Sequence, residues 1–239
     1  MSPGLTGKAA PAPGLKRGLG GTSPLARYPR LYLAVARRRY GDRIVGADTD
    51  IMIEGFPRSA NTFAVTAFRF AQPGPVVVAH HLHAVAHVAR AVELGVPVML
   101  LVRAPEDAVH SVLARKPGQP PAAVAEAYAR FYEGVVPHLE RCVVAEFEQV
   151  TTDLGTVIDR VNERFGTAFA RFEHTDENVQ RCFARIEEES RRRADGVLVE
   201  NVVARPSSDR TPAAGLAVSP ELRARLDRAY DAVVEHAAR

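Results

Sequence analysis

Short runs of β-branched residues alternate with longer helical patterns along most of the chain from residue 51 onward. Apolar residues at helical spacing, or a helix-start pattern, follow each apolar run, and such alternation is typical of βαβ units. The runs that predict buried strands are 51–54, 76–79, 96–102 and 142–147. The stretches that predict helices are 62–70, 84–94, 105–114, 122–140, 154–165 and one opening at Ser219-Pro220. We therefore predict a single α/β domain with a mostly parallel sheet flanked by helices.

The first 44 residues have a different composition from the rest. Residues 1–26 are rich in Gly, Pro, Ala and Ser, a composition that cannot offset the entropy lost on ordering. The stretch 29–40 is basic and partly apolar and predicts a short helix. That helix could dock on the body, lie on an acidic surface or grip an acceptor. We divide the chain into a disordered, basic arm (1–44) and an α/β domain (45–239).

Length and charge narrow the class of protein further. The chain has 239 residues, 46% of them hydrophobic, which is enough for one domain with a core. No apolar run approaches the roughly 18 residues of a membrane span, so we expect a cytoplasmic protein, with peripheral membrane contact left open for the arm. Residues 1–43 hold nine Lys and Arg against one acid, so the basic charge belongs to the arm. Because the chain has only three lysines, its arginine content is weak evidence for nucleic acid, and we expect no nucleic-acid partner.

A candidate phosphate loop follows the first predicted strand. A turn from strand to helix presents backbone N–H groups and a helix N-terminus to an anion. Aligned with the pattern G-x-x-x-x-G-K-[ST], Gly55 and Thr62 match in place. Ala60 stands where the second Gly would be, and Asn61 stands where the Lys would be. The sequence therefore predicts a P-loop-like turn without its lysine.

The neighbouring strand also differs from that of an ATP or GTP enzyme. Such an enzyme places a Mg²⁺-binding acid at the end of a neighbouring strand. Here the predicted strand 96–102 ends in Arg103. Transfer of a sulfuryl group can be served by positive side chains and amides alone, so the pattern favours chemistry without a metal, and we assign no metal ligands.

The segment 55–63 resembles the 5′-phosphosulfate loop of sulfotransferases that use 3′-phosphoadenosine-5′-phosphosulfate (PAPS), with Arg58 at the position of the family's usual lysine. Arg103, with Ser111 eight positions later, resembles the family's arginine and serine that hold the 3′-phosphate. The segment 205–210 resembles the family's late basic loop, and Phe147 stands where the family has a tyrosine. The resemblance covers residues 51 to about 230. The donor-binding residues that it implies are Arg58, Ser59, Ala60, Asn61, Thr62, Phe63, Arg103, Ser111, Arg205 and Arg210.

Histidines gather directly after the second predicted strand, beside the phosphate loop. This edge of an open α/β sheet binds ligands, and histidine titrates in the range that a general base requires. Many cytosolic sulfotransferases carry Thr-His-Leu here, and the resemblance of His80-His81-Leu82 implies His81 as the base. His83 and then His80 are the alternatives.

Other readings of the same region stay open. His87 is more typical of packing than of catalysis, although it could bind a metal together with His80 and His83. Some branches of the family use a carboxylate as base, so Glu54 and Glu93 are outside candidates.

The resemblance implies transfer of a sulfuryl group from PAPS, with its desulfated form PAP as the product. Arg58 would stabilise charge on the leaving 5′-phosphate, with His81 or His83 as the base. The acceptor would be a hydroxyl or amine of a small molecule or glycan, including carbohydrate, lipid-linked or small-metabolite acceptors. The alternatives are a nucleotide or small-molecule kinase built on a P-loop, and a nucleotide-binding protein without catalysis.

Overall fold

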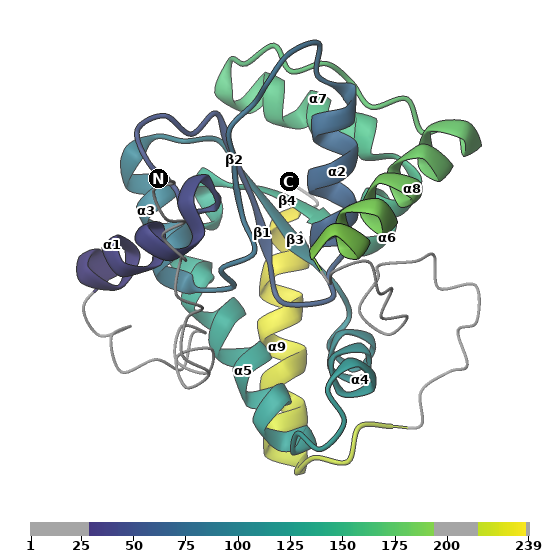
Figure 1. Ribbon diagram of the computed structural model, residues 1–239. Coiled ribbons are helices and arrows are strands. Elements are labelled where there is room, and N and C mark those ends of the chain that lie inside the picture. The colour runs from purple at the N-terminus through teal and green to yellow at the C-terminus, as the bar shows by residue number, and fades with distance from the viewer. Residues whose placement is uncertain (1–28, 194–214, 238–239) are drawn as a thin grey trace, which may run out of the picture.

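A computed structural model describes residues 29–193 and 215–237. A four-stranded parallel sheet with the order β2-β1-β3-β4 forms the centre of the molecule (Figure 1). Its strands are β1 (Ile51–Gly55), β2 (Val78–His80), β3 (Val98–Val102) and β4 (Val143–Glu146). The predicted parallel α/β sheet flanked by helices is confirmed.

Helices cover both faces of this sheet, as Figure 1 shows. On one face lie α2 (Asn61–Ala71), α6 (Phe147–Thr152), α7 (Leu154–Phe165) and α8 (Asp176–Arg193). On the other face lie α3 (Val85–Leu94), α4 (Pro105–Arg115), α5 (Pro121–Val135) and α9 (Pro220–Ala237). Helix α1 (Pro29–Tyr40) and the 3-10 segments η3 (Gly41–Arg43) and η4 (Val136–Arg141) complete the described elements.

The strands are mostly apolar because both faces of the sheet are buried. Side chains alternate between the two faces along each strand. Met52 and Leu100 therefore pack in the cluster under α3, α4, α5 and α9. Ile53, Met99 and Leu101 pack in the cluster under α2, α7 and α8. Glu54 falls in the same alternation as Met52, and this places a carboxylate inside the apolar layer.

Several predicted boundaries were wrong by a few residues. The strand expected at 76–79 begins at Val78 and runs to His80. The strand expected at 142–147 ends at Glu146, because Glu146 and Gln149 form a capping box that opens α6. The helix expected at 122–140 ends at Val135, and a 3-10 turn containing Pro137, which has no N–H to donate, takes its place.

Helix α1 packs on the body beside the segment that follows β2. Tyr32, Leu33 and Ala36 are buried together with Ile44 and Leu82. The prediction for residues 1–28 lies outside the described residues. In the described part of the chain, no helix is both long and apolar enough to cross a membrane.

Candidate active site

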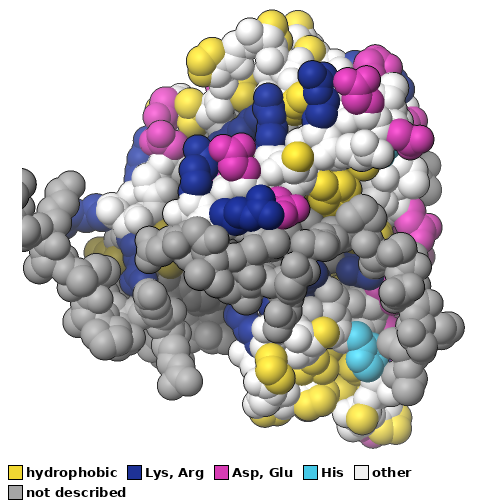
Figure 2. Space-filling view, turned by 45° about the vertical axis from the view of Figure 1, so that its right-hand side comes forward, with side chains coloured by type: hydrophobic (Ala, Val, Ile, Leu, Met, Phe, Trp, Pro, Cys, Tyr) yellow, Lys and Arg dark blue, Asp and Glu magenta, His cyan; other side chains and the backbone are white. Residues whose placement is uncertain are grey.

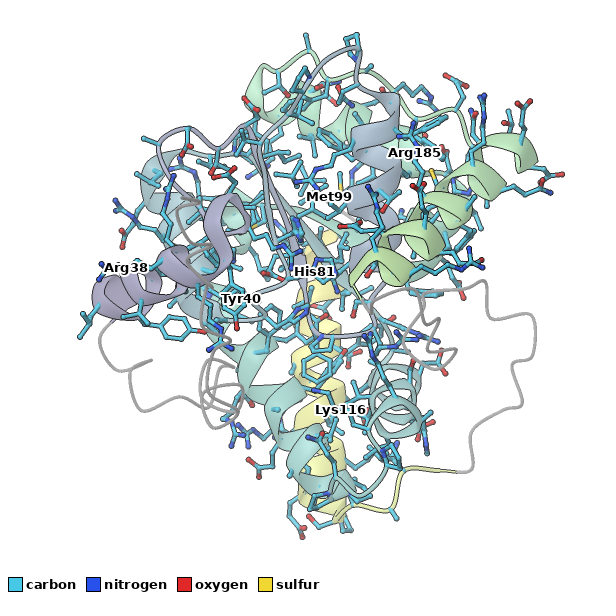
Figure 3. The ribbon with its side chains drawn as sticks, in the orientation of Figure 1. Arg38, Tyr40, His81, Met99, Lys116 and Arg185 are labelled. Carbon is cyan, nitrogen blue, oxygen red and sulfur yellow. The ribbon has the colours of Figure 1, made fainter. Side chains whose placement is uncertain are left out.

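A cavity of about 630 Å³ opens beside the phosphate loop, at the edge of the sheet where the parallel strands end. Figure 3 shows His81 near these strand ends and Lys116 below it, on the side of α4. Ser59 is a fully buried residue of the loop and does not line the cavity. Arg205 and Arg210 lie outside the described residues. The residues predicted from the sequence that line the cavity are Arg58, Ala60, Asn61, Thr62, Phe63, His81, His83, Arg103 and Ser111.

The loop between β1 and α2 adopts a strained conformation. Arg58 and Ala60 have φ values of 74° and 65°, in the left-handed region that favours glycine. Ala60, at the N-cap of α2, occupies the place of the second Gly in the phosphate-loop pattern. Gly55 packs so closely on Leu101 of β3 that an added Cβ would clash with the Leu101 carbonyl oxygen. Residues held in such sparsely populated conformations cluster at functional sites.

The hydroxyl of Tyr132, on α5, links the loop to β3, and the sequence did not predict this contact. This hydroxyl donates to the Leu101 carbonyl oxygen at 2.8 Å and accepts from the Phe56 backbone N–H at 3.3 Å. The Ser59 hydroxyl lies 3.4 Å from the same oxygen. Burial raises the pKa of Tyr132 above its ordinary value, so the hydroxyl keeps its proton. The Asn61 amide closes the loop by donating to the Phe56 carbonyl oxygen at 3.0 Å.

Positive side chains gather on the α4 side of the cavity. Arg58 Nε donates to Ser111 Oγ at 2.8 Å, and an Arg103 guanidinium N–H donates to the Arg58 carbonyl oxygen at 3.2 Å. Burial, and then the charges of Arg115 and Arg103, lower the pKa of Arg58. Arg115 and Lys116 also line the cavity, whereas none of its described lining residues is Asp or Glu. Cations held this close together favour an anionic ligand.

The sequence analysis missed Arg115, although a signal for it was present. Ser111 and Arg115 are four residues apart on α4, so they share one face of the helix. The predicted position of Ser111 at the site therefore also placed Arg115 there.

Aromatic side chains form another part of the cavity wall. The Arg103 guanidinium lies 4.2 Å from the centre of the Phe147 ring, within the range of a cation–π contact. Phe63 stacks on Phe183 of α8 with ring centres 5.4 Å apart, and Val179 lines the same wall. A flat aromatic group fits such a surface. The helices named in the sequence analysis do not include α8, and it named neither Val179 nor Phe183 as a site residue.

Glu54 is fully buried at the end of β1 and accepts hydrogen bonds from several donors. Its Oε2 accepts from the backbone N–H groups of Leu82 at 2.9 Å and His83 at 3.2 Å, and from His87 Nδ1 at 3.1 Å. Its Oε1 lies 3.2 Å from the Gly55 backbone nitrogen and 3.1 Å from His83 Nδ1. Burial alone would raise the pKa of Glu54, but the charge and hydrogen bond of His83, with His87, hold it well below its usual value. Glu54 is therefore an ionised carboxylate, and it lines neither of the two cavities described here.

The hydrogen bonds of His87 fix its tautomer. Its Nε2 accepts the Val45 backbone N–H at 3.0 Å, so this nitrogen carries no proton. Its Nδ1 therefore carries the proton and donates it to Glu54. Because the ring is also fully buried, the prediction that His87 packs is confirmed.

His83 has one ring nitrogen fixed and the other available. Its Nδ1 lies 2.6 Å from the Gly55 carbonyl oxygen and 3.1 Å from Glu54 Oε1. Because both of these oxygens are acceptors, Nδ1 carries a proton and donates it to the hydrogen bonds. Its Nε2 makes no hydrogen bond to any residue that the structure describes. Burial alone would lower the pKa of His83, but the charge of Glu54 and the hydrogen bonds to Glu54 and Gly55 raise it. His83 thus presents a ring of raised pKa to the cavity.

His80 and His81 form a coupled pair. Their Nδ1 atoms lie 2.6 Å apart, and His81 Nε2 lies 3.1 Å from Thr62 Oγ1 at the start of α2. Burial, followed by the charges of His81, Arg69 and Arg43, lowers the pKa of His80 to about 2. Since His80 stays neutral, its Nδ1 can accept a hydrogen bond from a protonated His81. A proton that enters the pair therefore resides on His81.

The remaining candidates lie apart from this centre. Glu93 is exposed and pairs with Arg90 at 2.8 Å, outside the cavity lining. Among residues 29–193 and 215–237, no group of three or more His, Cys, Asp or Glu side chains is arranged to hold a metal ion.

Comparison with known proteins identifies a likeness of structure but not of sequence. No protein-family model and no curated protein sequence matches the chain. Among solved structures, the chain is similar to the mouse sulfotransferase SULT7A1, which was crystallised with PAP. The TM-score is 0.47 at 14% identity, and the match covers 82% of this chain and 88% of the mouse chain.

Proposed function

We propose that the protein is a sulfotransferase that moves a sulfuryl group from PAPS to a hydroxyl or amine of a small acceptor. The observation that carries this proposal is the loop cavity, in which a phosphate-type loop faces four cationic side chains. The described lining contains no carboxylate to hold Mg²⁺, which a kinase of this loop type requires. Sulfuryl transfer involves less negative charge than phosphoryl transfer, and positive side chains with loop amides can stabilise that charge.

The cavity offers separate places for the parts of the donor. The loop amides and the N-terminus of α2 suit the 5′-phosphosulfate. Arg103 and Ser111 suit the 3′-phosphate, with Arg115 and Lys116 as two further cations on the same side. The wall that contains Phe147 suits the adenine base by stacking. The mutual repulsion of the half-buried arginines supports this fit, because a bound anion would relieve it.

Transfer requires one bond to form and one to break. The acceptor oxygen or nitrogen attacks sulfur, and the bond from sulfur to the bridging oxygen breaks, so its electron pair leaves with PAP. His81 Nε2 takes the proton of the acceptor, and its Nδ1–H donates to neutral His80. Arg58 and the loop amides stabilise the charge that develops on the 5′-phosphate.

His83 has a different role in this proposal. Its pKa is raised, so at neutral pH it holds more positive charge than an ordinary histidine. Its Nδ1 is anchored by Glu54 and Gly55, which leaves Nε2 to donate to an oxygen of the 5′-phosphate. We assign it as a cation for the leaving group, with the alternative that it serves as the base.

The test measures conversion of PAPS to PAP without added metal, with water as the acceptor, by chromatography of the two nucleotides. Loss of a general base typically lowers a rate about 10²–10⁴-fold, so His81→Asn should do so while PAP affinity stays within about threefold. His138→Asn is the matched control, because this residue lies in η4 and lines neither cavity. Full turnover in His81→Asn together with loss in His83→Asn would move the base to His83. No turnover together with a response to ATP and Mg²⁺ would contradict the sulfotransferase proposal.

A further inference from the structure

A second cavity of about 720 Å³ lies between the end of α1 with η3, helix α2 and helix α8. Among the described residues, Thr62 and His81 line both this cavity and the loop cavity. His80 lines the second cavity only. The proposed base therefore stands at the boundary, with the donor cavity on one side and the second cavity on the other.

Charged side chains dominate the second cavity. Val65 and Tyr40 are the only large apolar or aromatic residues among its described lining, apart from the two histidines. Four arginines and three acids line it: Arg43, Arg69, Arg185, Arg192, Asp42, Glu188 and Glu189. An apolar acceptor would desolvate these groups without replacing their interactions with water.

Two of the four arginines act on the histidine end of the cavity. Burial, then His81, then the charges of Arg69 and Arg43 lower the pKa of His80, so both arginines act on this ring. Glu188, in contrast, belongs to the exposed part of α8, where it lies 4.0 Å from Arg192. Figure 2 shows basic and acidic side chains interspersed on the face of the molecule that contains α8. Arg43 and Arg69 therefore bring positive charge to the end of the cavity next to the histidines.

We infer that the second cavity is the acceptor site and that it takes a small hydroxylated molecule carrying a carboxylate or phosphate group. The anionic group lies against Arg43 and Arg69, where charge-assisted hydrogen bonds replace its hydration. The reacting hydroxyl lies against His81, which faces the donor through the boundary with Thr62. Sugar acids and sugar phosphates share this chemistry. The inference rests on the proposed function, because it places the acceptor relative to PAPS.

Calorimetry on the full chain saturated with PAP tests this inference. The probes are glucuronate, glucose 6-phosphate, glucose and 2-naphthol. We expect at least one charged sugar to bind about tenfold more tightly than glucose or naphthol, and the two charged probes distinguish a carboxylate from a phosphate. In Arg69→Gln this preference should fall below about twofold. Arg90→Gln is the control, because Arg90 is an exposed residue of α3 that lines neither cavity.

Because Arg69 is exposed, its substitution should leave the fold intact, and Arg43→Gln provides a second variant on a separate element. Equal binding of the four probes, a preference for naphthol, or full charge preference in both variants would overturn the inference. PAP binding is measured first. If PAP does not bind, the proposed function and the acceptor site fail together. If PAP binds and charge makes no difference, only the acceptor site fails.

Discussion

Replacing Glu54 by Gln should destabilise the protein strongly, because both oxygens of the buried carboxylate accept hydrogen bonds. An amide keeps one acceptor oxygen and turns an N–H₂ group toward donors that need an acceptor. If its oxygen replaces Oε2, the Gly55 N–H and His83 Nδ1 lose their acceptor on Glu54. A hydrogen bond to a charged group is worth about 1.5–3 kcal/mol, and breaking a buried ion pair costs about 3–5 kcal/mol. We therefore expect a loss of about 3–5 kcal/mol, a large part of the 5–15 kcal/mol that is typical of a domain.

Urea denaturation of the full chain measures this loss, with Glu93→Gln as the matched control. Glu93 is exposed and makes a surface pair with Arg90, so its substitution should cost less than about 0.5 kcal/mol. The pKa of folded Glu54 lies below its usual 4.5, so its contribution is present above that pH and is lost as pH falls through the folded pKa. The difference between wild type and Glu54→Gln should therefore shrink in acid. A loss below about 1 kcal/mol at neutral pH would refute the network as described.

Three further predictions concern the loop cavity. Ala60→Gly should stabilise the protein by about 0.5–1 kcal/mol in the same denaturation, because relief of left-handed strain exceeds the entropy lost by glycine; destabilisation would contradict this. Arg103→Ala should weaken PAP binding about 10- to 100-fold by calorimetry, whereas Arg130→Ala, in an exposed pair, should not change it; equal affinities would place the 3′-phosphate elsewhere. PAP affinity should fall about tenfold as pH rises through the raised pKa of His83, and a His83→Gln variant that keeps the same decline would exclude this role.

The part of the site that depends on local patterns could be predicted from the sequence. The carboxyl ends of parallel strands meet at one edge, so the loop after β1, His81 after β2 and Arg103 after β3 had to lie close together. Ala60 stands in the place of the second Gly of the phosphate-loop pattern, and its φ of 65° lies in the left-handed region that favours glycine.

The rest of the site depends on contacts between distant segments. Tyr132 supports Phe56 across 76 residues of sequence, and no local pattern marks a helix tyrosine as a loop support. The tautomer of His87 depends on its contact with Val45, 42 residues away. Helix α8 was not among the helices named in the sequence analysis because charged residues outnumber its apolar ones, so the apolar positions that reach the cavity, such as Phe183, form only a weak pattern.

Calorimetric titration of the purified protein with PAP, in a buffer containing a metal chelator, tests the central claim most directly. We predict saturable binding of one PAP per chain, abolished or strongly weakened by Arg103→Ala, and no comparable binding of ATP when Mg²⁺ is supplied. PAP carries the 3′-phosphate that Arg103 and Ser111 are proposed to hold, and ATP does not. Tight binding of ATP with Mg²⁺ and none of PAP would contradict the assignment of the cavity to PAPS.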